Sequence, residues 1–180
     1  MAASELTDRR AAFTPSYVAA YEAWFHQLDG APDRAADAAA RTIALAAEHN
    51  FPTWLGAGML HSAIARAAQG EPGAADELDA GIEMWRKVGG AELLVPYFLC
   101  QLGQARLTAG AVARAEEALN SAIATAEASG ERFYLPPLLL VRSTLDTPDP
   151  SGRTPAAMRE AALQAAAIQG WDPARLGPVR

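Results

Sequence analysis

Apolar residues recur along the chain at intervals of three, four and seven positions, in segments that short turns separate. Such intervals place side chains on one face of a helix. The first face lies in residues 15–29 and carries Tyr17, Val18, Tyr21, Trp24, Phe25 and Leu28. The whole pattern predicts helices over residues 15–29, 32–49, 52–69, 74–88, 91–109, 112–129, 132–145 and 155–169.

Turn-forming residues interrupt this pattern in a regular phase. Gly30, Gly70 and Gly110 are 40 residues apart, and a second series, offset by 20, contains Asn50, Gly90, Gly130 and Gly170. A fixed period of this kind is the signature of a repeat architecture, and glycine commonly ends helices. We therefore predict an all-α fold, a right-handed α-solenoid of about four helix–turn–helix repeats over residues 14–50, 51–90, 91–130 and 131–170.

The predicted repeat domain spans residues 14–176. Residues 1–13 lack a periodic apolar face and are expected to be a flexible N-terminal segment. Thr14-Pro15 is typical of an N-cap followed by proline at the first helical position, so the first helix is expected to begin there.

The last repeat is the least regular. Pro136-Pro137 falls in its first helix, and its turn expands over residues 146–153, which contain Pro148, Pro150 and Gly152. Beyond it, Trp171 and Leu176 are expected to be exposed at the end of the array. Because terminal repeats normally carry a polar cap, an end-to-end homodimer is a hypothesis for this chain.

Composition and charge argue against several classes of function. Hydrophobic residues make up 51% of the chain, and alanine alone about a quarter, which favours helix. The formal charge of −6, without a basic patch, argues against nucleic-acid binding by this chain alone. No apolar run is long enough for a membrane span. Cys100 is the only cysteine, which excludes an internal disulfide and fits a reduced, cytoplasmic setting.

No catalytic or metal-binding motif is apparent in the sequence. His26, His49 and His61 lack the spacing of helical metal ligands, and neither Ser62 nor Ser143 has an adjacent base. No phosphate-binding loop motif occurs. We therefore expect a non-catalytic protein without metal or cofactor.

The candidate binding residues lie on the first helix of each repeat. Tyr21, His61 and Gln101 occupy one column of the repeat alignment, one residue per helix, and Tyr97, Gln104 and Arg142 are the further candidates on these helices. Polar residues on otherwise apolar first helices could line the concave face of a solenoid and bind a peptide or small ligand. The alternative, favoured for any single residue, is that they pack between helices with satisfied hydrogen bonds.

The repeat units carry a family resemblance. Units with Trp or Tyr early in the first helix and Ala in the second resemble tetratricopeptide repeats, although 40 residues exceeds the usual period of about 34. The segments 51–110 and 129–143 look like the repeat tails of large bacterial regulators that join an AAA-type ATPase, often with a nucleotide cyclase or LuxR-like DNA-binding domain. This resemblance covers residues 17–145 and, more weakly, 155–172. It rests on Trp54, Gly70, Trp85, Gly90, Ala91, Leu93, Pro96, Tyr97, Gly110, Gly130, Glu131, Arg132, Phe133 and Tyr134.

Such tails imply an interaction or regulatory module, either within a larger regulator or as a stand-alone relative. Our first expectation is a scaffold that binds a peptide or partner protein on the concave face of the first helices. A small-molecule sensor is the second, and an enzyme on a helical-repeat scaffold the third.

Overall fold

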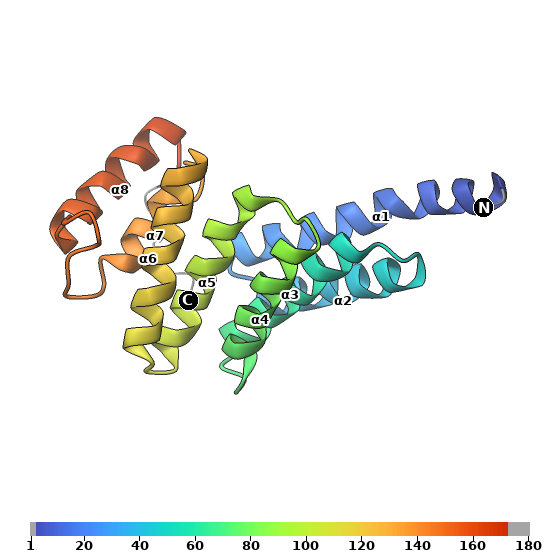
Figure 1. The fold of residues 1–180 in the computed structure, drawn as a ribbon, viewed down its shortest axis with the longest axis horizontal. Coiled ribbons are helices and arrows are strands. Elements are labelled where there is room, and N and C mark those ends of the chain that lie inside the picture. The colour runs from blue at the N-terminus through green and yellow to red at the C-terminus, as the bar shows by residue number, and fades with distance from the viewer. Residues whose placement is uncertain (1–2, 173–180) are drawn as a thin grey trace. The chain divides into compact units, whose positions relative to one another are not determined.

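The computed structural model describes residues 3–172, with backbone alone for residues 3–10 and 93. Over this range the chain forms eight α-helices, one short 3-10 helix and no strand, which confirms the predicted all-α class (Figure 1). The chain divides at Gly90 into two compact units, called unit 1 (residues 1–90) and unit 2 (residues 91–180) below. Each is described by itself.

Unit 1 consists of two helical hairpins. They are formed by α1 (Ala3–Leu28), α2 (Pro32–Glu48), α3 (Pro52–Ala68) and α4 (Ala74–Lys87). Within this unit α2 packs against α1 and α3, α1 also reaches α3, and α3 packs against α4. The first helices of the two hairpins, α1 and α3, are therefore neighbours.

Unit 2 has the same order of elements. Its hairpins are formed by η1 (Glu92–Leu94) with α5 (Val95–Thr108), α6 (Val112–Ser129), α7 (Leu135–Arg142) and α8 (Pro155–Gln169). Here α5 packs against α6 and α7, α6 also packs against α7, and α7 packs against α8.

Left-handed backbone conformations end the helices at almost all predicted turns. Positive φ angles occur at six of the seven predicted positions: Gly30, Asn50, Gly70, Gly110, Gly130 and Gly170. At the seventh, Gly89 rather than Gly90 adopts this conformation, with φ of 74°. Glycine has no Cβ to clash in this region, which is why it is the usual residue there.

The predicted start of the first helix is wrong. α1 begins at Ala3 and contains Pro15, instead of beginning at Pro15 after a flexible segment. An internal proline removes one backbone hydrogen bond and costs about 3 kcal/mol. Tertiary contacts oppose this cost: Phe13 packs edge-on against Phe51 and Trp54, and Ala12 is buried.

The fourth hairpin is irregular, as its prolines predict, but its first helix is shorter than expected. α7 covers residues 135–142 rather than 132–145, with Pro136 and Pro137 in its first turn, where proline is tolerated. The connection to α8 is correspondingly longer, over residues 143–154. Leu176 and the end of the predicted repeat domain lie outside the described residues.

The apolar stripe predicted for α1 also faces differently from what its residue types suggest. Its buried side is made of alanines: Ala19, Ala20 and Ala23 are at most 4% exposed, and Ala23 meets Ala38 and Ala39 of α2. Tyr17, Val18 and Phe25, in contrast, are 42%, 44% and 57% exposed. Small side chains let the two helices approach closely, so the large residues of the stripe are left on the outside.

Candidate functional site

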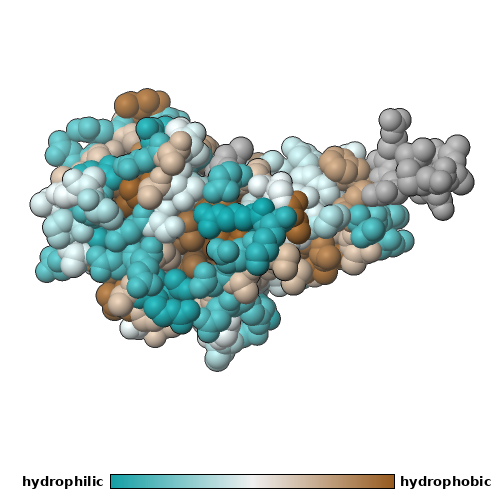
Figure 2. Space-filling view, in the orientation of Figure 1, coloured by the Kyte–Doolittle hydropathy of each residue, from teal (hydrophilic) through white to brown (hydrophobic). Residues whose placement is uncertain are grey.

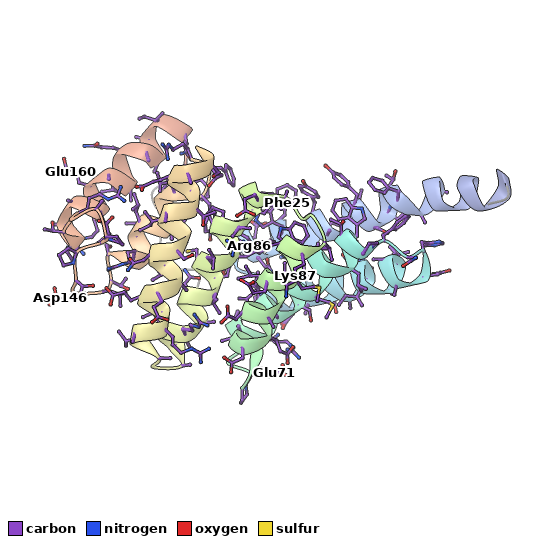
Figure 3. All side chains as sticks on the ribbon, viewed as in Figure 1. Phe25, Glu71, Arg86, Lys87, Asp146 and Glu160 are labelled. Atoms are coloured by element: carbon purple, nitrogen blue, oxygen red, sulfur yellow. The ribbon has the colours of Figure 1, made fainter. Side chains whose placement is uncertain are left out.

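An aromatic surface lies along α1 and the start of α3. Its seven rings, each in contact with at least one other, belong to Phe13, Tyr17, Tyr21, Trp24, Phe25, Phe51 and Trp54. Ring centroids are separated by 4.5 Å for the closest pair and 6.5 Å for the most distant, within the range of favourable aromatic contacts. Phe13 is 47% exposed, and Phe25 projects from α1 (Figure 3). We call these seven residues the aromatic surface.

Helical spacing produces this surface. The aromatic residues of α1 follow one another at intervals of four, four and three residues from Phe13 to Trp24, which aligns them along one side of the helix. Phe51 and Trp54 reach the same side from the first turn of α3. The rings thus belong to the first helices of both hairpins of unit 1.

Two tyrosine side chains lie at the middle of the aromatic surface. The Tyr17 and Tyr21 ring centroids are 4.5 Å apart. Burial raises the pKa of Tyr21, and the neighbouring Tyr17 hydroxyl raises it further. Tyr21 therefore stays a neutral phenol at physiological pH and can both donate and accept hydrogen bonds.

A hollow lies at the α3 end of the aromatic surface. It has a volume of about 340 Å³ and is lined by Phe13, Asn50, Phe51, Pro52, Thr53 and Trp54. Asn50 adopts a left-handed conformation with φ of 53°, a region where asparagine is one of the better-tolerated residues. Apolar rings beside a polar amide are suited to binding an extended chain that carries both kinds of group.

A second concavity, called the α3/α4 groove below, has a volume of about 430 Å³. Its lining residues are Ile43 of α2, then Gly56, Met59, Ser62, Ala63 and Arg66 of α3, and Glu77, Ala80, Gly81 and Met84 of α4. Small residues make room between the helices, and Met59 and Met84 are 57% and 52% exposed. Apolar residues also interrupt the hydrophilic surface around α2 to α4 in the space-filling view (Figure 2).

Arg66 is the cationic residue of the α3/α4 groove. Its guanidinium forms ion pairs with Glu77, another lining residue, and with Glu71, at 3.5 Å. The Arg66 Nε atom is buried and has no hydrogen-bond partner among the described residues.

His61 lies in the interior of unit 1. Its Nδ1 is 2.8 Å from Oε1 of Gln27, and Nε2 of Gln27 donates to the His61 carbonyl at 2.9 Å. This orientation of the Gln27 amide makes Nδ1 the donor in the first contact. Burial lowers the pKa of His61 to about 4, so the ring is neutral at pH 7. His61 ties α3 to the end of α1.

Tyr97 and Gln101 lie in the interior of unit 2. The Gln101 amide donates to the hydroxyl of Tyr134 at 2.8 Å, and the rings of Tyr97 and Tyr134 meet edge-on at 4.8 Å. Burial raises the pKa of the Cys100 thiol beside them, which keeps it protonated and unreactive. These side chains join α5 to α7.

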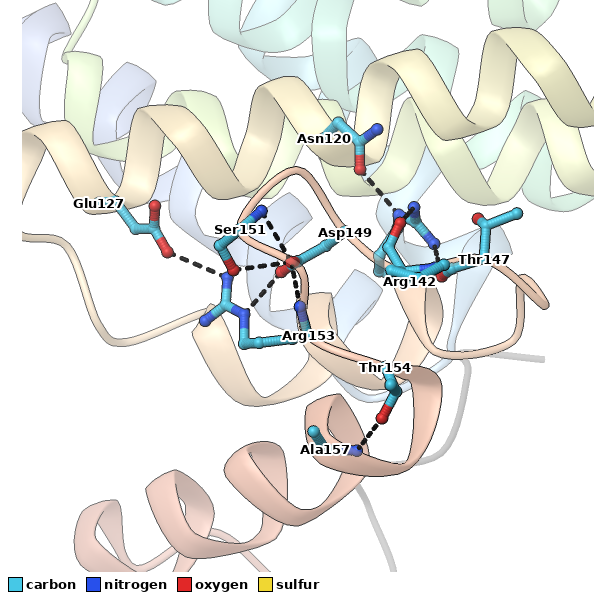
Figure 4. Close-up of polar contacts among 10 residues, drawn as sticks. Asn120, Glu127, Arg142, Thr147, Asp149, Ser151, Arg153, Thr154 and Ala157 are labelled. Carbon is cyan, nitrogen blue, oxygen red and sulfur yellow. Dashed lines mark hydrogen bonds and ion pairs between the residues drawn. The ribbon is translucent and has the colours of Figure 1, made fainter.

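Arg142 is fully buried at the end of α7 and organises the long connection that follows (Figure 4). It donates to Asn120 Oδ1 and Glu116 Oε1 of α6, at 2.8 Å each, and to the carbonyls of Thr147 and Pro148. A guanidinium with four such partners is a structural tie between α6, α7 and the loop.

Asp149 holds the far side of the same loop. It accepts hydrogen bonds from the backbone and hydroxyl of Ser151 and from the backbone and side chain of Arg153, which also pairs with Glu127 (Figure 4). Burial by itself would raise the pKa of Asp149, but the hydrogen bonds from Ser151 and Arg153 outweigh it, and the pKa is lowered. The Asp149 carboxylate thus forms its hydrogen bonds with residues of the loop itself.

The six sequence-predicted site residues have different surroundings. His61, Tyr97, Gln101 and Arg142 are buried between helices of their own unit. Tyr21 and Gln104 are partly exposed, and Tyr21 belongs to the aromatic surface. The structure joins Gln101 and Tyr97 through Tyr134, while Tyr21 and His61 lie in the other unit.

Sequence reasoning missed the residues of the α3/α4 groove. Met59, Arg66 and Glu77 are not among the candidate residues that the sequence pattern indicates. A usable signal existed, because Gly56, Ala63, Ala80 and Gly81 place small residues on both helices of one hairpin, where they can leave a gap.

No protein-family model, curated protein or solved structure matches this chain. None of the helices in the described range is long and apolar enough to cross a membrane. Among residues 3–172, no group of three or more His, Cys, Asp or Glu side chains is arranged to hold a metal ion.

Proposed function

We propose that this protein is a non-catalytic interaction module that binds a peptide segment of a partner protein through the aromatic surface of α1 and α3. The observation that carries the proposal is the contact network of seven rings, of which Phe13, Tyr17 and Phe25 are about half exposed. Tyr and Trp supply large, rigid contact areas with polar tips, and they are enriched among residues that dominate binding energy.

The partner segment that suits this surface is basic and rich in proline. Aromatic faces attract Arg and Lys side chains through cation–π contacts, and aromatic-lined grooves accept proline-rich extended chains. The formal charge of −6 favours approach by a basic segment.

The helical hairpins support a repeat interpretation of the fold. In this proposal they are tetratricopeptide-like units of a right-handed α-solenoid with a 40-residue period, and α1 and α3 are first helices of such units. The sequence resemblance to repeat tails of bacterial ATPase and cyclase regulators supports a regulatory role in the cytoplasm. The domains encoded with this chain in its gene would test that role.

Selection from a phage-displayed peptide library tests the binding proposal. Peptides selected on the whole chain should be enriched in Arg and Pro, and should lose at least about tenfold in affinity to the Tyr17→Ala variant. Phe133→Ala is the matched control, since Phe133 is a 50% exposed aromatic residue of unit 2. Selected peptides that bind wild type and Tyr17→Ala equally would refute the role of the aromatic surface.

A second candidate function, a small-molecule-binding module, is favoured by a separate observation. The α3/α4 groove, at about 430 Å³, falls within the usual range of about 300–1,000 Å³ for ligand pockets. Like those pockets it is mainly apolar with a few polar groups.

A further inference from the structure

Three aromatic rings meet at steep angles around the hollow at the α3 end of the aromatic surface. Phe13 lies edge-on to both Phe51 and Trp54, with interplanar angles of 83° and 73° and ring centroids 5.9 Å and 5.7 Å apart. All three rings line the hollow, whose volume is about 340 Å³. Rings set at such angles around a concavity are suited to binding a cation, because the face of each ring carries a negative potential.

The charges around the hollow also favour a cation. The described residues that line it are all uncharged, so a cation that enters meets no positive side chain among them. The Glu48 carboxylate lies 3.9 Å from His49 Nε2, and the His49 ring centroid is 6.1 Å from that of Phe51. Unit 1 has 12 acidic against 7 basic residues, whereas unit 2 has 9 against 8. The negative charge of the chain is therefore concentrated in the unit that contains the hollow.

The lining of the hollow discriminates between kinds of cation. Because it has no carboxylate among the described residues, a cation that enters loses water without gaining an ion pair there. A guanidinium loses less than an ammonium does, since it is more weakly hydrated, and its flat face stacks on aromatic rings. Asn50 and Thr53, the polar residues of the lining, have side-chain oxygens that can accept hydrogen bonds from guanidinium N–H groups. These features suit an arginine side chain better than a lysine.

We infer that the hollow is the arginine subsite of the aromatic surface, where one arginine side chain of a bound peptide stacks among Phe13, Phe51 and Trp54. This inference rests on the proposed peptide binding. It adds which residue type the hollow selects and where on the aromatic surface that residue lies.

Three peptides of one length test the selection: acetyl-Pro-Pro-Xaa-Pro-Pro-amide with arginine, lysine or citrulline at the central position. Citrulline has nearly the shape of arginine without its charge. The whole chain is labelled with 5-fluorotryptophan and titrated with each peptide by fluorine NMR. The arginine peptide should shift the Trp54 signal with a dissociation constant below about 1 mM, and should bind at least about fivefold more tightly than the other two. Trp85, which is 2% exposed, and Trp171 of unit 2 should not respond.

Two variants test the location. Phe51→Leu keeps an apolar side chain but removes the ring, so it should weaken binding of the arginine peptide at least about threefold and leave the citrulline peptide unchanged. Asn50→Asp adds a carboxylate to the lining at a position with φ of 53°, which aspartate also tolerates, and should strengthen arginine binding about threefold. Phe133→Leu, at an exposed aromatic position of unit 2, is the matched control and should change neither affinity.

Other results would overturn the inference. Equal binding of the arginine and citrulline peptides would show that the aromatic surface accepts proline-rich chains while the hollow does not select a cation. Tighter binding of the lysine peptide would contradict the preference for a guanidinium. Arginine binding that Phe51→Leu leaves unchanged would place the arginine elsewhere on the surface. No response to the arginine peptide would reject the subsite, and the library selection would then decide separately whether the aromatic surface binds peptides at all.

Discussion

Units 1 and 2 share one order of helices but differ in how far the large side chains of their first helices are buried. In unit 1 the α1/α2 interface is filled by alanines, and the rings of α1 remain outside. In unit 2 the first helix α5 buries large side chains: Tyr97 and Phe98 are almost fully buried, as are Leu119 of α6 and Leu138 of α7. Tyr97 is equivalent to Tyr17 in the 40-residue alignment, so the two units differ in whether this side of the first helix is covered.

The polar side chains of the two units follow the same division. Unit 2 uses a buried arginine and a hydrogen-bonded aspartate to fix its long loop. Arg66 of unit 1, in contrast, lines a groove, and its Nε atom has no partner among the described residues. Both proposed binding sites consequently lie in unit 1. Three changes would sharpen or break this contrast, and they are ordered by expected effect.

The largest expected effect is that of Arg142→Ala. Removing this side chain leaves Glu116, Asn120 and two loop carbonyls without their donor, so unfolding free energy should fall by about 3–5 kcal/mol. Urea denaturation followed by circular dichroism measures it. Arg132→Ala, at an exposed position of the same unit, should change stability by less than about 0.5 kcal/mol. A loss below about 1 kcal/mol in Arg142→Ala would show that the loop does not depend on this residue.

Unit 1 also contains a buried polar contact, formed by His61, whose contribution to stability should depend on pH. The folded pKa of His61, about 4, lies below its ordinary value. As pH falls, the unfolded chain therefore binds a proton before the folded protein does, and the free energy of unfolding decreases. Between pH 7 and pH 4 the loss should reach about 3 kcal/mol.

His61→Gln should remove this part of the pH dependence, although it also lowers stability at pH 7. Urea denaturation followed by tryptophan fluorescence is suitable, because Trp24, Trp54 and Trp85 all lie in unit 1. His26→Gln, on α1, is the matched control and should keep the wild-type slope. An unchanged slope in His61→Gln would contradict the buried, neutral state of this histidine.

The smallest of the three effects should come from Asp149→Asn. Its carboxylate accepts charged and neutral hydrogen bonds, so the variant should lose about 2 kcal/mol at pH 7. Because the folded pKa of Asp149 is lowered, its contribution exists above the unfolded pKa and disappears as pH falls through the folded one. The difference from wild type should therefore shrink below about pH 4.

Asp146→Asn controls for the general loss of a charge in this loop, since Asp146 is exposed. Thermal unfolding of both variants at pH 7 and pH 3 makes the comparison. If Asp149→Asn were as stable as Asp146→Asn at pH 7, the hydrogen bonds around Asp149 would not be stabilising.

The sequence by itself determined where the helices lie and where most of them end. Glycines and one asparagine set the turns, because few residues adopt positive φ without strain, and a period near 3.6 identifies the helices regardless of their neighbours. These are local properties of the chain. The helix boundaries that were misjudged lie beside prolines: at Pro15, at the start of α5, where a 3-10 turn precedes Val95, and at the short α7.

Only the tertiary structure decided which side of each helix is buried. A stripe of Tyr, Trp and Phe on α1 suggests a core face, yet the closest helix approach runs through Ala19, Ala20 and Ala23. Likewise, His61, Gln101 and Arg142 resemble groove residues until their partners, far away in sequence, are seen to satisfy them. Burial depends on which neighbour comes near, and a helical pattern specifies a face without specifying its neighbour.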